Sequence, residues 1–314
     1  MRNLKFICCQ PATLYYAWQV EVLINNFLEM GVKPEQIDII CQREGAIPKE
    51  WLKLMSYPVT FHFYEDTRES KAYISSIRPN ILKQHFAKFP ELRDYAIFYH
   101  DCDIILTKPF NWVTDEMLSD DFWYGSNTDH YMDSNYILSK GQEVMDMMCR
   151  VMRIDEKLVF ENDKNTIGAQ YLMKNVDSKF WEDVENDSEM LYVRVNNLSA
   201  QIKAKNPSYH ELQIWCADMW ALLWGAWRRG EKSIAHPSFD FSWASAPICK
   251  KDGVQDFESC NIMHNAGVLG GGEYFYKADY INKLPYDEEL NLVEGASNEY
   301  FKWVKKVGKI SKIK

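Results

Sequence analysis

Residues 95–106, which read YAIFYHDCDIIL, constrain this chain more than any other segment. The first five predict a buried strand, because aromatic and β-branched residues follow one another without the polar alternation of a half-exposed strand. Asp101 and Asp103 lie where that strand ends. In an extended backbone, residues two apart point to the same side, with Cα atoms roughly 6 to 7 Å apart. The two carboxylates are therefore expected to converge on one cation.

A second interpretation of the same aspartates needs no ligand, with Asp101 closing the strand and Asp103 solvated. The metal interpretation is preferred for two reasons. Two converging carboxylates repel each other unless a cation lies between them. Ligands also collect at strand ends in α/β sheets.

The first hundred residues alternate between strand-like and helix-like patterns. Strands are predicted at residues 4–9, 37–41, 59–64 and 95–99, and helices at 16–30, 48–55 and 74–89. This order implies a mostly parallel, Rossmann-like sheet flanked by helices. Later elements are predicted as strands at 122–126 and after a small-residue turn at 166–171, and as helices at 141–152, from 180 onward and at 209–227. No Gly/Pro/Ser-rich linker interrupts the chain, so a single domain is expected.

The composition is that of a globular protein, with 46% apolar and 26% charged residues. No segment approaches the ~20 apolar residues of a membrane span, and the first residues lack the apolar core of a signal peptide. A cytoplasmic protein without a membrane span is therefore expected. The eight cysteines form no CxxC pair, which favours reduced, buried thiols over disulfides or a zinc site.

The charge is unevenly distributed along the chain. The net charge is −9, yet residues 302–314 contain six lysines and no acid. This basic C-terminal tail is interpreted as an arm for phosphates, such as those of DNA, or as a solvated terminal helix.

A parallel-sheet first half followed by Asp-x-Asp at the end of an internal strand resembles the GT-A class of nucleotide-sugar glycosyltransferases. The motif His264-x-x-Gly267 with Lys277 downstream extends the resemblance, because several GT-A families have a late His-x-x-Gly element followed by a lysine. Here the lysine is spaced more loosely, across three glycines. The resemblance implies a GT-A-like domain at 1–301, with a nucleotide-binding half at 1–110 and a sugar and acceptor half at 111–301.

The resemblance also implies a nucleotide-sugar donor and a divalent cofactor, Mn²⁺ or Mg²⁺. Asp101, Asp103 and His264 are the implied metal ligands, where a cation stabilises the charge that develops on a leaving nucleoside diphosphate. For His264 the alternative is a hydrogen-bonded histidine in a polar loop. Further contacts to the donor are expected from Gln10, Pro11, Thr13, Tyr16, Arg78, Lys83, Asp101, Gly168, Ala169, Gly267 and Lys277.

Three residues are candidates for catalysis. Gln170 follows the small residues Gly168 and Ala169, which let a sugar approach, and it is placed to bond a hydroxyl or flank the anomeric carbon. The alternative is a tight turn before a strand. Glu211 and Asp218 are predicted on one face of the 209–227 helix, where an unpaired buried carboxylate is costly.

Asp218 is the preferred acid of that pair, either accepting the acceptor's proton or holding a sugar hydroxyl. Alternatively, Asp218 pairs with an arginine such as Arg228 as a structural bridge. Four tryptophans are candidates to stack on the acceptor, with core packing as the alternative for each: Trp215, Trp220, Trp224 and Trp243.

The sequence predicts a metal-dependent glycosyltransferase that favours UDP-sugars. Retention of anomeric configuration is expected by analogy with transferases that act on serine or hydroxyproline hydroxyls. The acceptor stays open among a glycan, a protein hydroxyl and a hydroxymethylated pyrimidine of DNA, the last as in some phage-encoded glycosyltransferases.

Two other classes of protein also stay open. One is a phosphatase of the haloacid-dehalogenase type, with the first aspartate as nucleophile, and the other is a binding module that holds a structural cation.

Overall fold

The computed structural model describes residues 1–249 and 256–314 and divides into two compact units. Unit 1 comprises residues 1–3, 66–97 and 119–236, and unit 2 comprises residues 4–65, 98–118 and 237–314. Each unit is thus assembled from three separate segments of the chain. The domain boundaries expected from the sequence stay predictions.

Unit 2 begins with three parallel strands, β1 (Leu4–Pro11), β2 (Ile37–Arg43) and β3 (Thr60–Glu65). In the ladders between them, Phe6 lies opposite Ile37 and Asp38 lies opposite Thr60. All three strands lie within two residues of their predicted bounds. The apolar run of β1 is buried almost throughout, as expected for a parallel strand covered on both faces.

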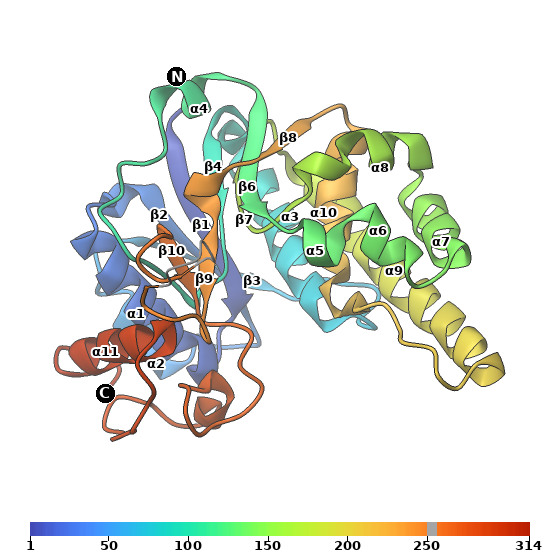
Figure 1. Ribbon diagram of the computed structural model, residues 1–314. Coiled ribbons are helices and arrows are strands. Elements are labelled where there is room, and N and C mark those ends of the chain that lie inside the picture. Colours follow the sequence, from blue (N-terminus) through green and yellow to red (C-terminus); the bar gives the residue numbers. More distant parts are fainter. Residues whose placement is uncertain (250–255) are drawn as a thin grey trace. The chain divides into compact units, whose positions relative to one another are not determined.

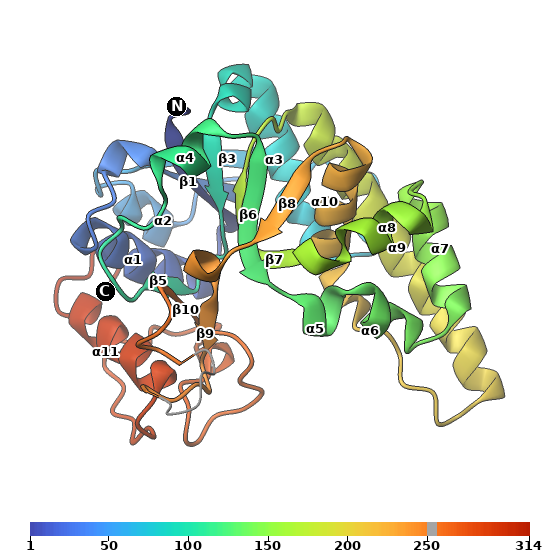
Figure 2. The ribbon, with the colours of Figure 1, turned by 45° about the horizontal axis from the view of Figure 1, so that its top comes forward.

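The helices of unit 2 lie between these strands and at the end of the chain. They are α1 (Leu14–Glu29), η1 (Pro34–Gln36), α2 (Lys49–Leu54), η6 (Pro237–Phe239), η7 (Lys277–Tyr280) and α11 (Ala296–Gly308). Both ribbon views show α11 next to α1 (Figures 1 and 2). Residues 302–308 of the predicted tail therefore belong to a packed helix, whose buried face includes Val304 and Val307.

A second, small sheet in unit 2 was not predicted. It consists of β5 (Ile104–Leu106), β9 (Phe241–Trp243) and β10 (Ile262–His264). The central strand β10 pairs antiparallel with β5 and parallel with β9. Strands of three residues are too short for hydrophobic periodicity to reveal.

Unit 1 contains β6 (Phe122–Asn127), β7 (Ile167–Met173) and β8 (Lys232–Ala235). Strand β6 pairs antiparallel with β7 and parallel with β8. The register shifts after Gly125, so that Ala169 and Gln170 bulge out of the ladder, and Ala169 has a left-handed φ of 61°. The predicted small-residue turn is therefore an irregular part of a strand.

Helices make up most of unit 1. They are η2 (Ile74–Ser76), α3 (Ile77–Lys88), η3 (Pro90–Asp94), α5 (Asp129–Met132), α6 (Ser134–Leu138), α7 (Gln142–Met152), α8 (Glu156–Asn162), η4 (Asp163–Asn165), α9 (Ser178–Lys205), η5 (Ile214–Cys216) and α10 (Ala217–Arg228). The long α9 lies against α7 and α10 (Figure 2). A short helix α4 (Asp115–Ser119) precedes β6.

The predicted helix at 209–227 is wrong in its first half, because only η5 and α10 are helical there. Two tertiary hydrogen bonds hold the preceding segment in another conformation. The Gln213 amide donates to the Tyr136 hydroxyl at 3.3 Å, and the Tyr73 hydroxyl lies 2.7 Å from the Trp215 carbonyl oxygen. Glu211 therefore lies outside the helix and does not share a face with Asp218.

With β4 (Ala96–Tyr99), seven strands follow the order β3-β2-β1-β4-β7-β6-β8. This mostly parallel sheet flanked by helices confirms the predicted α/β class. All eight cysteines are free thiols, six of them buried. Among the described residues, no helix combines the length and the apolar character needed to span a bilayer.

Candidate active site

Asp101, Asp103 and His264 lie together in unit 2, with one ligand atom of each within 4.8 Å of the others. His264 Nε2 is 3.2 Å from Oδ1 of Asp103 and 3.5 Å from Oδ2 of Asp101. Ligands of one octahedral ion at ~2.1 Å from the metal lie roughly 3 to 4 Å apart. Two carboxylates and one imidazole thus fit a divalent cation that accepts oxygen and nitrogen ligands.

The small sheet brings His264 to the aspartates from far along the chain. In the antiparallel β5–β10 ladder, His264 lies opposite Ile104, the residue after Asp103. The Asn265 amide also donates to the Asp103 carbonyl oxygen at 2.9 Å. The expected extended backbone through both aspartates is wrong, because Cys102 and Asp103 form a turn between β4 and β5. The carboxylates nevertheless converge, because that turn and β10 meet.

Asp103 is buried and forms an ion pair with the ammonium group of Lys277 through Oδ2. Burial raises the pKa of the Asp103 carboxyl, but the charges of Lys277 and His264 outweigh burial and hold the pKa well below its usual range. Burial likewise lowers the pKa of Lys277, and the charge of Asp103 reverses that effect and raises it. Both groups are therefore ionised at neutral pH, and an ionised carboxylate is what a metal requires.

Two aromatic residues of β9 hold the His264 ring. Trp243 lies nearly parallel to it, with an interplanar angle of 13° and ring centroids 6.4 Å apart, and Phe241 meets it edge-on at 5.3 Å. Gly267 has a φ of +85°, and a Cβ there would lie 3.1 Å from Cε3 of Trp243. Gly267 thus shapes the turn that leaves room for Trp243, which packs on the histidine.

The residues predicted at the end of β1 line the start of α1. Gln10 is buried, and its amide donates to the Ile40 carbonyl oxygen at 3.4 Å. Pro11 ends β1, and Thr13 precedes α1 with its carbonyl oxygen accepting a hydrogen bond from the Trp51 indole at 3.1 Å. These three residues therefore shape the backbone of the strand–helix junction.

Tyr16 is half-buried and meets Tyr15 edge-on, with ring centroids 4.9 Å apart. Burial raises the pKa of Tyr15 to about 12, against the opposing charge of Lys277 and with a smaller contribution from Asp103. Tyr15 therefore lies within electrostatic reach of the ion pair.

Two of the basic residues predicted for the nucleotide site, Arg78 and Lys83, form ion pairs inside unit 1. Arg78 binds Oδ2 of Asp218 at 2.6 Å, and Lys83 binds Oε2 of Glu185 at 2.7 Å. The Tyr73 hydroxyl lies 2.5 Å from the other Asp218 oxygen. A structural bridge at Asp218 was one of the alternatives, but its partner is Arg78. The expected partner, Arg228, instead binds Asp187 at 2.9 Å.

The remaining candidates also lie in unit 1. Glu211 is exposed and pairs with Lys203 at 3.0 Å. Gln170 is fully buried in the β7 bulge, next to the half-buried Ala169. A Cβ on Gly168 would lie 2.8 Å from Cγ2 of the β-branched Thr128, as well as 2.6 Å from the flexible methyl end of Met219, so packing favours a glycine there.

The partners of the candidate residues were harder to find from sequence. Nothing in the local pattern marked Tyr73 as the partner of Asp218, or Phe241 as a support for His264. Trp243 was noted as an aromatic residue that packs or stacks, without its link to His264. A pairing of the short runs at 104–106 and 262–264 is the signal that would have revealed this support.

Comparison with known proteins was made at the levels of sequence and of fold. No protein-family model and no curated protein matches the sequence. The fold matches the bifunctional glycosyltransferase WbbM over 98% of this chain and 51% of that chain, at 8% identity and a TM-score of 0.50. This chain thus spans about half the length of WbbM.

Two further solved structures are similar over nearly the whole chain. They are the galactosyltransferase LgtC with donor and acceptor sugar analogs (12% identity, 96% of this chain and 95% of that chain, TM-score 0.42) and the glycosyltransferase GlyE of Streptococcus pneumoniae TIGR4 (10% identity, 99% and 62%, TM-score 0.42). At such low identity, the likeness to WbbM shows the fold alone. This chain has the GT-A fold of glycosyltransferases, as its sequence predicted.

Proposed function

We propose that this protein is a metal-dependent glycosyltransferase that moves a sugar from a nucleotide-diphosphate sugar to a hydroxyl acceptor. The observation that carries the proposal is the cluster of Asp101, Asp103 and His264, held together by the β5–β10 ladder. The GT-A fold supports it and favours a transferase over the phosphatase and the binding module.

The chemistry follows from the charges of the cluster. A bound Mn²⁺ or Mg²⁺ supplies Lewis-acid stabilisation of the leaving diphosphate. Asp103 and His264 are fixed by burial and packing, whereas the Asp101 side chain is 35% exposed. Lys277 is placed to donate a charge-assisted hydrogen bond to a phosphate oxygen. During transfer, the bond between the sugar's C1 and the phosphate oxygen breaks, and its electron pair stays on the diphosphate. The acceptor oxygen bonds to C1 and passes its proton to the departing diphosphate.

Among the residues predicted to bind the nucleotide, those of unit 2 are better supported than those of unit 1. Gln10, Pro11, Thr13 and Tyr16 gather where β1 meets α1. Arg78 and Lys83 are less favoured as diphosphate contacts, because an acid of unit 1 already neutralises the charge of each. UDP-sugars are the first donors to test.

Retention of configuration stays part of the proposal. An inverting enzyme needs a carboxylate free to take the acceptor's proton. Both acids predicted for that task bind cations, Asp218 with Arg78 and Glu211 with Lys203. Gln170 remains the candidate to flank the anomeric carbon. Product NMR that shows inversion at the anomeric carbon contradicts this part of the proposal.

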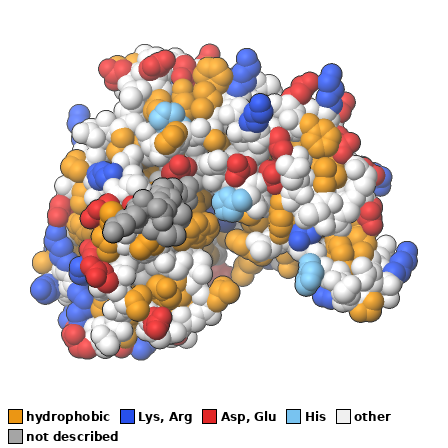
Figure 3. All heavy atoms as spheres, viewed as in Figure 1, with side chains coloured by type: hydrophobic (Ala, Val, Ile, Leu, Met, Phe, Trp, Pro, Cys, Tyr) orange, Lys and Arg blue, Asp and Glu red, His pale blue; other side chains and the backbone are white. Residues whose placement is uncertain are grey.

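For the acceptor, we favour a glycan or a protein hydroxyl over DNA. Four of the six tail lysines, on which the DNA hypothesis rested, bind acids of the same chain, and blue and red side chains intermingle over α11 in Figure 3. The pairs are Lys302–Glu299, Lys305–Glu289, Lys306–Glu29 and Lys314–Asp287. These pairs leave the tail with little of the excess charge that phosphate binding requires.

The proposal is tested by incubating the protein with UDP-glucose, UDP-galactose and GDP-mannose, with and without MnCl₂. We expect manganese-dependent release of the nucleoside diphosphate, abolished in Asp103→Asn. Asp94→Asn is the control, since Asp94 is an exposed acid of unit 1. Phosphatase activity without transfer or release supports the rival enzyme class, and inertness toward all three donors supports the binding module.

A further inference from the structure

Trp215 has an exposure that sets it apart from the other tryptophans. All eleven lie among the described residues, and Trp215, at 64% exposure, is the only one in the exposed class. Its indole makes no hydrogen bond or ring contact to any described residue. An indole usually buries most of its large surface, so a held but exposed ring is a candidate binding surface.

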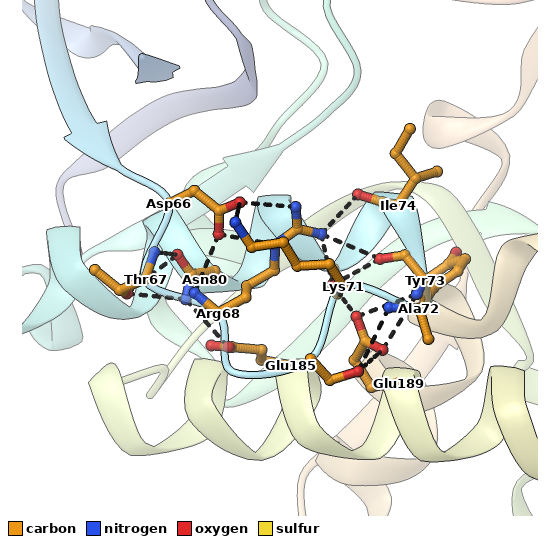
Figure 4. A network of polar contacts seen from close by, with 12 residues as sticks. Asp66, Thr67, Arg68, Lys71, Ala72, Tyr73, Ile74, Asn80, Glu185 and Glu189 are labelled. Atoms are coloured by element: carbon orange, nitrogen blue, oxygen red, sulfur yellow. Dashed lines mark hydrogen bonds and ion pairs between the residues drawn. The ribbon is translucent and has the colours of Figure 1, made fainter. Parts of the chain in front are cut away.

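Tyr73, whose hydroxyl contacts the Trp215 carbonyl oxygen, links Trp215 to two other residues with exposed apolar side chains. Ile74, 81% exposed, follows Tyr73 in the chain, and Met190, 44% exposed, follows Glu189. Both Glu189 carboxylate oxygens accept a hydrogen bond from the Tyr73 amide at 3.2 Å. Figure 4 shows the Ile74 side chain pointing away from this polar network. Trp215, Ile74 and Met190, called the patch below, are thus three exposed apolar side chains of unit 1, each of a residue that bonds Tyr73 or directly follows Tyr73 or Glu189 in the chain.

The backbone beneath the patch is held firmly. The Tyr73 hydroxyl lies 2.7 Å from the Trp215 carbonyl oxygen, and Ser76 donates to Glu189 at 2.6 Å. Arg68 donates to the carbonyl oxygens of Tyr73 and Ile74, both at 3.2 Å (Figure 4). A surface fixed in this way loses little conformational entropy when a ligand binds.

Charged groups lie at the edge of the patch. The Tyr73 hydroxyl that contacts the Trp215 carbonyl also lies 2.5 Å from Asp218, and Asp218 binds Arg78. The Arg78 side chain is 25% exposed, and that of Asp218 only 11%. An arginine fork and a carboxylate recognise neighbouring hydroxyl groups, while a flat indole covers apolar C–H groups.

We propose that Trp215 is the stacking platform of a carbohydrate subsite, with Arg78 and Asp218 bonding hydroxyl groups at its edge. A pyranose ring matches this surface because it has an apolar C–H face and a polar rim. Three side chains offer far less than the ~800 Å² per partner of a stable protein interface, which disfavours a protein ligand. This assignment rests on side chains of unit 1 alone.

The test uses cellotriose, maltotriose and chitotriose as probes in saturation-transfer difference NMR with the full chain. We expect saturation transfer from the protein to at least one probe. In Trp215→Ala, the Kd for that probe should be roughly five to ten times higher. Trp215→Phe retains part of the affinity, because a smaller ring still stacks. Phe160→Ala is the matched control, since Phe160 is an aromatic residue of unit 1 with 45% exposure, and it should bind like the wild type.

A second readout separates this inference from the proposed function. The thermal shift with UDP and MnCl₂ should be unchanged in Trp215→Ala, because the metal cluster lies in unit 2. The absence of that shift in the wild type counts against the proposed function. The carbohydrate subsite is overturned if none of the three probes shows saturation transfer from the protein. It is also overturned if Trp215→Ala shows the same saturation transfer as the wild type. Equal loss in Phe160→Ala also overturns it.

Discussion

The ammonium group of Lys277 binds the buried carboxylate of Asp103 at Oδ2, while His264 faces Oδ1 of the same group. A divalent cation at this site and the Lys277 ammonium group would therefore compete for the negative charge of the Asp103 carboxylate. A phosphate group that binds Lys277 weakens the ion pair between Lys277 and Asp103. Binding of the cation to Asp103 then becomes more favourable. Nucleotide and metal are thus expected to strengthen each other's binding by more than their direct contact.

Replacing Lys277 by methionine should separate these two effects. We expect Lys277→Met to bind Mn²⁺ roughly tenfold more tightly, because a competing positive charge next to Asp103 is removed. Binding of UDP should weaken, because the phosphate loses a charge-assisted contact. Isothermal titration of each ligand, alone and in the presence of the other, measures both changes.

Lys283→Met is the control for this experiment, since Lys283 binds Glu288 in an exposed ion pair at 2.7 Å. This variant should leave both affinities unchanged. Weaker Mn²⁺ binding in Lys277→Met would show that the lysine supports the metal site, and the competition would be refuted.

Gly267→Ala should loosen the His264 side of the cluster. The added methyl group meets a φ of +85° and lies 3.1 Å from Trp243, the ring that packs on His264. Gly230 has nearly the same φ, +87°, with nothing within 4 Å of an added Cβ. Both alanine variants should lose about 1 kcal/mol of unfolding free energy from the backbone strain. Only Gly267→Ala should also weaken Mn²⁺ binding, measured by titration, and equal Mn²⁺ affinity in the two variants would contradict this.

The sequence predicted the long and regular parts of the molecule. The strands at 4–9, 37–41, 59–64 and 95–99 are all present, because each segment is rich in apolar, aromatic and β-branched residues. The pair of aspartates and the late histidine were also found, because their residue types are those of metal ligands. Their convergence was derived from an extended backbone, although a turn at Cys102 and Asp103 places them.

The parts that could not be predicted depend on contacts between distant segments. The β5–β10 register places His264 next to Asp103, and three-residue strands carry no periodicity of their own. The apolar spacing after residue 209 resembled a helix, but hydrogen bonds with the hydroxyls of Tyr73 and Tyr136 hold residues before α10 in another conformation. Tertiary contacts of this kind override local propensity.

The ion pair between Asp66 and Arg68 should make the stability of unit 1 depend on pH. Arg68 binds both carboxylate oxygens at 3.0 Å, and its hydrogen bonds hold the pKa of Asp66 well below its usual range. Asp66→Asn should therefore lower the unfolding free energy at pH 7 by about 1 to 2 kcal/mol. A depressed folded-state pKa stabilises the fold above the unfolded value of ~3.9 and loses this effect as the pH falls toward the folded-state pKa.

Urea denaturation of wild type and variant between pH 7 and pH 2.5 checks this dependence. The difference between them should be constant down to about pH 4 and shrink below it. Asp121→Asn is the control, because Asp121 binds Arg2 with its side chain 81% exposed, and no difference is expected. A gap between wild type and Asp66→Asn that stays constant to pH 2.5 would contradict the assigned role of the carboxylate.

Glu21→Gln should release the end of the chain from α1. The Glu21 carboxylate is fully buried and accepts four hydrogen bonds, from the Tyr57 hydroxyl, the Tyr286 hydroxyl, the Ser311 hydroxyl and the Lys312 amide, at 2.6 to 3.0 Å. Glutamine has one acceptor oxygen, so its NH₂ group must face two of these partners, and the Tyr286 and Ser311 hydroxyls on that side would have to turn from donors into acceptors. We expect a loss of about 2 to 3 kcal/mol of unfolding free energy.

The released end can be measured separately from global stability. Hydrogen exchange of residues 309–314 should become faster in Glu21→Gln at a temperature where the remainder of the chain stays protected. Glu29→Gln is the matched control, because it removes only an exposed ion pair with Lys306 and should cost less than about 0.5 kcal/mol. Equal exchange rates in the two variants would show that the buried face of α11 holds the terminus without Glu21. A selective increase in Glu21→Gln would identify this carboxylate as the anchor, and would explain why a lysine-rich segment packs on the body instead of extending toward an anionic partner.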